Sequence, residues 1–165
     1  MNIPIPEGTK RIVLISNIEE PPSFTFEPTD LIIECNVARH HSALLELFKD
    51  KQVNNFLVVR HNKNGHYLPA DFNKLSKTWS FIYFTSDLFG FSTEDWFKNY
   101  FCKTDGKTPT TGFCVYKYFR SRRPNMPIIG LGFNIDDKST PHNPMHDWQY
   151  EYQIYKGDKN FTTAI

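Results

Sequence analysis

Five short apolar runs occur along the chain, and each has the pattern of a β-strand buried within a sheet. They cover residues 11–16, 31–35, 55–60, 79–85 and 128–133. Helical patterns fall between them, at residues 42–49, at residues 92–101 and in the stretch that begins near Thr110. Strands that alternate with helices predict an α/β fold with a mainly parallel, twisted sheet flanked by helices. With 165 residues, we expect a single domain over residues 1–165 with its own core.

Composition narrows the classes of partner that the chain requires. Its net charge of +1 predicts no nucleic-acid partner, and no run approaches the ~20 apolar residues of a membrane helix, so we expect no transmembrane segment. An odd number of cysteines without metal-ligand spacing, and an N-terminus without a signal peptide, indicate reduced thiols in a cytoplasmic protein. The aromatic content of 16% predicts a packed core, and any aromatic surface left exposed would allow a homodimer.

The stretch P-T-T-G, which ends in Thr110, Thr111 and Gly112, has the features of a phosphate-binding helix start. The threonine hydroxyls can cap the helix, and its first N–H groups carry the positive end of the helix dipole. The glycine allows a ligand to approach the backbone closely. We therefore expect these three residues to contact the phosphates of a bound nucleotide.

Polar residues follow three of the predicted strands. Asn17 follows the first strand, Asn36 follows the second, and Asn134 follows Phe133 at the end of the run at 128–133. Because the carboxyl ends of parallel strands share one edge of a sheet, these residues are expected to lie together there, facing Gly112. Amide side chains both donate and accept hydrogen bonds, which suits a nucleotide, although each asparagine taken alone is better explained as a turn residue. The glycine-rich fingerprint of dinucleotide enzymes and the P-loop motif are both absent.

The last third of the chain also supplies two histidines and a carboxylate, at His142, His146 and Glu151. A histidine titrates near neutral pH and could therefore deprotonate a hydroxyl group. Taken without other information, the two histidines are more typical of a loop and a helix start than of a catalytic site. Three aromatic residues follow at helical spacing, and we interpret them as core contacts rather than as a platform for a sugar: Trp148, Tyr152 and Tyr155.

The order of these motifs resembles that of the sialyltransferase superfamily, which includes the animal-type enzymes and their bacterial relatives. A first motif, a strand with an Asn-containing turn and a hydrophobic strand ending in Asn, resembles residues 13–17 and 30–36. A second motif, P-[ST]-[ST]-G followed by a helix and a strand near G-F, resembles residues 109–112 and 128–133. A final motif, His-x4-Glu, matches His146 and Glu151, and H-D-W-Q resembles the short His-aromatic motif of the family.

The resemblance implies a GT-A-variant, Rossmann-type fold and transfer of sialic acid or a related keto-sugar acid from a CMP-activated donor. It implies an inverting reaction without a metal ion or other cofactor, and a glycan or lipooligosaccharide acceptor. His146 would be the base or a phosphate partner, Glu151 would orient the site, and His142 is a second candidate for either role. The implied nucleotide site comprises Asn17, Asn36, Thr110, Thr111, Gly112, Phe133 and Asn134. The alternative is a non-catalytic nucleotide- or glycan-binding domain of the same fold, which the short chain and the altered first turn, S-N-I-E-E-P, favour.

Overall fold

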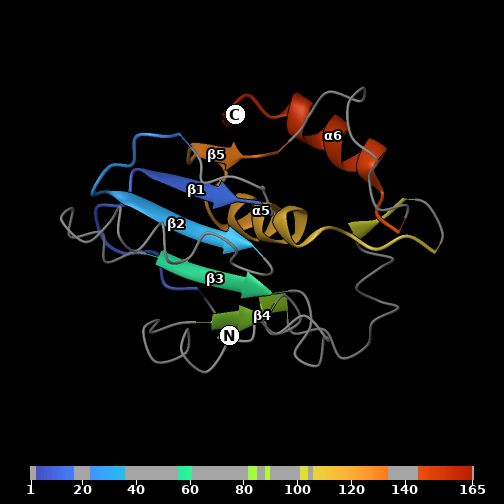
Figure 1. Cartoon of the computed structure of the whole chain (residues 1–165), viewed down its shortest axis with the longest axis horizontal. Coiled ribbons are helices and arrows are strands. Elements are labelled where there is room, and N and C mark those ends of the chain that lie inside the picture. Colours follow the sequence, from blue (N-terminus) through green and yellow to red (C-terminus); the bar gives the residue numbers. More distant parts are fainter. Residues whose placement is uncertain are drawn as a thin grey trace.

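A computed structural model of the chain describes residues 3–16, 23–35, 56–60, 82–84, 88–89, 101–103, 106–133 and 145–164. Within these ranges the named elements are six strands and two helices (Figure 1). In chain order they are β1 (Arg11–Ile15), β2 (Asp30–Cys35), β3 (Phe56–Arg60), β4 (Ile82–Phe84), α5 (Thr111–Arg122), β5 (Ile128–Leu131), α6 (Trp148–Gly157) and β6 (Phe161–Ala164). No helix of this described part is long and apolar enough to cross a membrane.

The six strands form one sheet in the order β4-β3-β2-β1-β5-β6, and every pairing between them is parallel. The chain builds outward from β1 to β4 on one side and then continues from β1 with β5 and β6 on the other. The α/β class and the parallel sheet predicted from the apolar runs are therefore confirmed. The arrows of β1 to β5 point the same way in Figure 1, so their carboxyl ends share one edge of the sheet.

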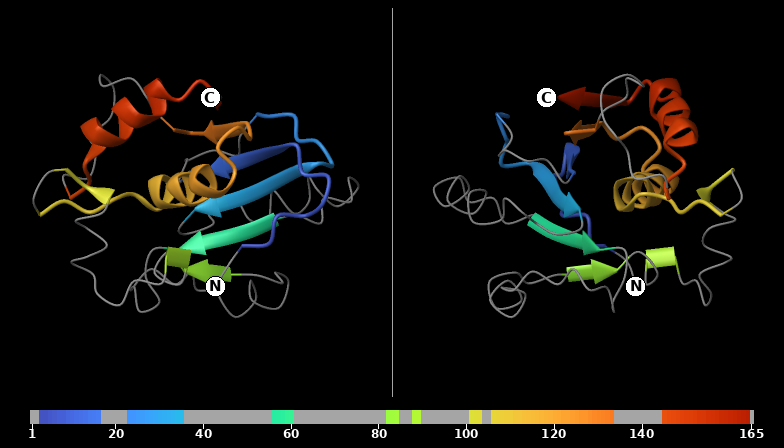
Figure 2. Two further views of the ribbon diagram at one scale, coloured as in Figure 1. Left: turned by 180° about the vertical axis from the view of Figure 1, so that it is seen from behind. Right: turned by 45° about the vertical axis from the view of Figure 1, so that its right-hand side comes forward.

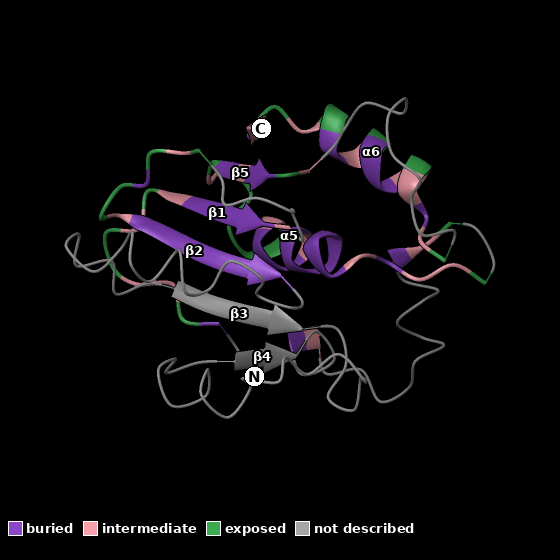
Figure 3. Cartoon of the chain, in the orientation of Figure 1, coloured by how far each residue is buried: buried purple, intermediate pink, exposed green. Residues whose placement is uncertain are grey.

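Alternate residues of the inner strands pack into two separate clusters, as expected for a sheet buried on both faces. Ile12 and Leu14 of β1 belong to the cluster that includes α5 and α6, and both helices lie on that face (Figure 2). Val13 and Ile15 point to the opposite face and pack with Phe26 of the segment that precedes β2. Helix α5 is buried along most of its length, whereas α6 keeps exposed residues on its outer side (Figure 3).

Two details of the predicted elements change in the structure. The strand predicted for residues 128–133 ends at Leu131, because Gly132 adopts φ 71°, a left-handed conformation that turns the chain away from the sheet. Phe133 consequently lies after the strand. The edge strand β6 was not predicted, because its sequence, F-T-T-A, is short and only its first residue is buried. The helices predicted at residues 42–49 and 92–101 lie outside the described residues, apart from Phe101.

Candidate functional site

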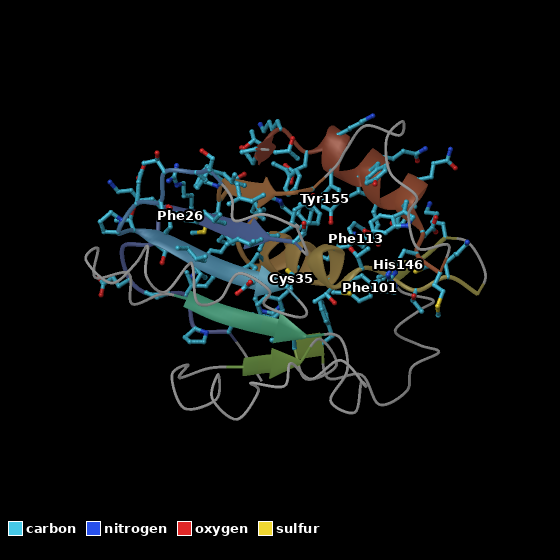
Figure 4. The ribbon with its side chains drawn as sticks, viewed as in Figure 1. Phe26, Cys35, Phe101, Phe113, His146 and Tyr155 are labelled. Carbon is cyan, nitrogen blue, oxygen red and sulfur yellow. The ribbon has the colours of Figure 1, made fainter. Side chains whose placement is uncertain are left out.

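The strand order reverses between β1 and β5, and the carboxyl ends of these two strands form the centre of the candidate site. In open parallel sheets, ligands bind outside the carboxyl ends of the strands at such a reversal. Here Ser16, directly after β1, donates its hydroxyl to the Gly132 carbonyl at 2.9 Å and its N–H to the Leu131 carbonyl at 3.0 Å. Helix α5 leads into β5, and helix α6 leads into β6. Each helix therefore runs in the opposite direction to the strands, and the N-termini of both lie at this same edge (Figure 4).

Helix α5 begins with the cap that the sequence predicts. Thr110 has extended backbone angles, and its hydroxyl oxygen accepts a hydrogen bond from the Phe113 N–H at 3.0 Å. Its carbonyl accepts the first helical hydrogen bond, from the Cys114 N–H. Threonine is favoured at this position because its hydroxyl binds one of the four N–H groups that a helix start leaves without a partner.

The carboxylate of Glu151 occupies the position in front of this helix start. Its Oε1 accepts the Thr110 N–H and its Oε2 accepts the Thr110 hydroxyl, both at 2.7 Å. The Glu151 side chain comes from α6 and only 1% of the residue is exposed. A negative group at the N-terminus of a helix is stabilised by the helix dipole. The anion preference of the α5 start is therefore met by a carboxylate of the chain itself.

Burial makes this carboxylate costly to ionise. It raises the pKa of Glu151 from 4.5 to about 7, although the two hydrogen bonds from Thr110 lower the pKa and the charge of Asp147 also raises it. Burial and the nearby Glu151 charge also raise the pKa values of the Cys114 thiol and the Tyr155 hydroxyl well above their ordinary values. Glu151 therefore lies in a poorly solvated environment and exchanges its proton near neutral pH.

His146 is fixed beside the segment that leads into α5. It forms an isolated parallel β-bridge with Thr108, and its Nδ1 lies 2.9 Å from the Thr108 carbonyl oxygen. A carbonyl oxygen only accepts, so this contact requires a proton on Nδ1. The neutral ring then carries its lone pair on Nε2, which is the arrangement of a histidine that acts as a base. The ring also packs edge-to-face with the half-buried ring of Trp148, at a centroid distance of 5.2 Å.

Three residues of the H-D-W-Q-Y-E stretch hold the segment that precedes α5. Besides His146 and Glu151, Asp147 accepts the Lys103 N–H at 2.9 Å through its Oδ2. Thr108 adds a hydrogen bond from its N–H to the Met145 carbonyl at 2.7 Å. Lys103, Thr108 and Thr110 are thus each hydrogen-bonded to the H-D-W-Q-Y-E stretch or to Met145 directly before it. Asp147 was not predicted as a site residue, although its position directly before a helix was an available signal, and nothing in the sequence marks Thr108.

The space beside Cα of Gly112 is filled by a side chain of the protein and is not open to a ligand. A Cβ atom at Gly112 would lie 2.7 Å from Cζ of Phe133, and one at Gly130 would lie 2.8 Å from the same ring. The Phe133 ring thus packs over two glycines, between β5 and the first turn of α5. It also contacts Tyr155 and Phe161 edge-to-face. Phe133 is part of the packing that closes the space behind the α5 start.

We expect Gly112→Ala to lower the free energy of unfolding by about 1–3 kcal/mol, because the new methyl group would overlap the Phe133 ring. Gly157→Ala is the matched control, since nothing lies within 4 Å of its new Cβ and alanine favours a helix. Urea denaturation of both variants measures the difference. Adding Phe133→Leu should recover part of the loss at Gly112. If the two glycine variants are equally stable, the close packing of Phe133 on Gly112 is wrong.

The structure brings together six of the predicted site residues: Thr110, Thr111, Gly112, Phe133, His146 and Glu151. Thr111 is 3% exposed, and Thr110 directs both its N–H and its hydroxyl to Glu151. Four further predicted residues lie outside the described ranges: Asn17, Asn36, Asn134 and His142. The strands that precede the three asparagines do end at the shared edge. Over the described residues, no group of three His, Cys, Asp or Glu side chains could hold a metal ion.

The three aromatic residues that were predicted to face the core from α6 are buried to different degrees. Tyr152 and Tyr155 belong to the core, with 6% and 3% of each residue exposed, as the sequence predicts. Trp148 packs against the same core but stays half-buried.

Comparison of the chain with protein-family models, with curated proteins and with solved structures gives no significant match.

Proposed function

We propose that the chain is a sialyltransferase-like glycosyltransferase of the GT-A-variant, Rossmann-type architecture. It would transfer sialic acid or a related keto-sugar acid from a CMP-activated donor to a glycan or lipooligosaccharide acceptor. The donor would bind at the carboxyl edge of the sheet, at the reversal between β1 and β5. His146 would act as the base that deprotonates the acceptor hydroxyl.

The observation that carries this proposal is the meeting of two stretches that lie 38 residues apart in sequence. The P-T-T-G stretch contacts the H-D-W-Q-Y-E stretch through the hydrogen bonds of Thr110 to Glu151, and Thr108, directly before P-T-T-G, adds the bridge to His146. A histidine with a protonated Nδ1 therefore lies next to a helix start, at the sheet edge where such folds bind nucleotides.

One observation favours the alternative, a non-catalytic nucleotide- or glycan-binding domain. The Glu151 carboxylate lies at the α5 start, and Thr111 and Gly112 behind it are buried. A donor phosphate would therefore have to approach from the side of the sheet edge or displace this carboxylate. Helix α6 begins at the same edge, and the side chain of its N-cap residue Asp147 accepts no capping hydrogen bond from the N–H groups of its first turn.

Thermal denaturation with CMP, CDP, UDP, GDP, AMP and NAD tests the proposed donor. At 100 times its dissociation constant, a ligand specific for the folded state adds about 2.7 kcal/mol, which raises the Tm of a chain of this size by about 5–10 °C. We expect stabilisation by CMP, and weaker stabilisation in Thr111→Ala and Asn36→Ala. Hydrolysis of a CMP-sugar without acceptor would support the enzyme, and CMP binding without turnover would support the alternative. A shift with UDP or GDP alone would exclude a CMP donor. No shift with any nucleotide would contradict the transferase and leave only the glycan-binding form of the alternative.

A further inference from the structure

The aromatic ring that lies next to the candidate base belongs to a residue that is only partly buried. Trp148 is the first residue of α6, and its half-buried ring meets the His146 ring edge-to-face, with 81° between the two planes. On its inner side it packs against Tyr152, at a centroid distance of 6.0 Å and a tilt of 37°. Met145, just before the histidine, is 60% exposed. An apolar patch of Met145 and Trp148 therefore adjoins His146.

Trp148 has features that a packing role alone does not require. Tyr152 and Tyr155, which follow it on the same stripe of α6, are buried to 6% exposure or less, whereas the tryptophan at the sheet edge is not. Its ring contacts both Tyr152 and His146, and these two contacts restrict the orientation of the ring. A rigid aromatic surface beside a polar group is typical of a binding site, because the ring supplies contact area at a low entropic cost.

We propose that Trp148 is the platform on which the acceptor sugar ring stacks, with the hydroxyl of that sugar directed at Nε2 of His146. The identity of this occupant rests on the proposed function. The aliphatic C–H groups on one face of a pyranose carry partial positive charge and are attracted to the negative face of an aromatic ring. The Nδ1 atom of His146 is bound to the Thr108 carbonyl, so Nε2 is the nitrogen left to accept the hydroxyl proton of a sugar on the neighbouring ring.

The stacking is tested by sugar binding alone, without donor or turnover. The probes are methyl β-galactoside and methyl β-glucoside, titrated into the full chain labelled with 5-fluorotryptophan and followed by fluorine NMR. The chain has three tryptophans, so Trp79 and Trp96 serve as internal references, and the spectrum of Trp148→Phe identifies the Trp148 signal. We expect at least one glycoside to shift that signal selectively.

Two variants that keep an apolar side chain at this position separate the aromatic face from simple filling of space. Binding to each is followed through the glycoside C–H signals by saturation transfer. Trp148→Leu should weaken binding at least about tenfold, and Trp148→Phe by no more than about threefold, because phenylalanine keeps an aromatic face. Equal binding by the leucine variant and the natural chain would overturn the proposal. So would the absence of any glycoside shift, or a Trp148 signal that responds only to CMP, since the ring would then hold the nucleotide base.

The outcome for the sugar platform is separate from the outcome for the transferase. Selective glycoside binding by Trp148 in a chain that never turns over a CMP-sugar would refute the enzyme and support the platform in a glycan-binding domain. Turnover that is unaffected by Trp148→Leu, with an unchanged KM for the acceptor, would support the enzyme and refute the platform.

Discussion

Replacing Glu151 with glutamine is expected to make the protein more stable at pH 8 by about 3 kcal/mol, and to leave its stability nearly unchanged at pH 4.5. Glutamine has the shape of the protonated acid and carries no charge. Its carbonyl can accept the Thr110 N–H, and its amide can donate to the Thr110 hydroxyl oxygen, so both contacts survive. The variant therefore removes only the cost of ionising a buried carboxylate.

The sign of this effect follows from the direction of the pKa shift. The ordinary pKa of a solvated glutamate is 4.5, and burial raises the pKa of Glu151 to about 7 in the folded chain. Between these values the folded state binds more protons than the unfolded state, so the free energy of unfolding falls as pH rises. The stability that Glu151 contributes through its raised pKa is fully present below pH 4.5 and is lost as pH rises through about 7. A shift of this size corresponds to about 3 kcal/mol in total.

Urea denaturation at several pH values between about 4.5 and 8, for the natural chain and Glu151→Gln, measures this difference. Groups remote from Glu151 contribute equally in both proteins, so the difference reports Glu151 together with its charge interaction with Asp147. Glu7→Gln is the matched control, because Glu7 is exposed in the folded chain as it is in the unfolded one, and its effect should stay small and constant. A difference between Glu151→Gln and the natural chain that does not change with pH would show that Glu151 is not a buried, reluctantly ionised group.

The inner strands could be predicted from the sequence because a strand buried on both faces is a continuous apolar run. I-V-L-I and L-I-I are such runs, and they lie in β1 and β2 at the centre of the sheet. The edge strand β6 has no such run, because only Phe161 is buried. The error at Phe133 has a different cause. In G-L-G-F the apolar run continues through the second glycine, but that glycine takes a positive φ and ends the strand.

The candidate site could be predicted only where the signal was local. Thr110 was predicted as a helix cap from its position before an amphipathic stretch, and it is one. Its partner Glu151 is 41 residues away, and only the packing of α6 on α5 brings the two together. The same packing explains Gly112. A glycine at a helix start suggests close approach of a ligand, but here the approaching group is the Phe133 ring, which no sequence pattern identifies.

Replacing His146 with asparagine is expected to lower kcat for transfer by about 100- to 10,000-fold, the usual contribution of a general base. Asparagine places an amide nitrogen close to the position of Nδ1, so it can still donate to the Thr108 carbonyl. It has no group at the position of Nε2. The variant thus separates the hydrogen bond that holds the segment before α5 from the proton transfer, and its Tm and its stabilisation by CMP should match those of the natural chain.

The matched comparison is His142→Asn, because the sequence alone leaves the two histidines equivalent as candidates for the base. The hydrogen bond between Nδ1 of His146 and the Thr108 carbonyl favours His146 as the base, because a base requires a fixed tautomer and ring orientation. We therefore expect His142→Asn to retain transfer. If His142→Asn loses transfer and His146→Asn keeps it, the role of base moves to His142, and the contact with Thr108 serves only to hold the start of α6 beside that residue. If neither variant loses transfer, the base is a different group and the mechanism proposed for this edge of the sheet is wrong.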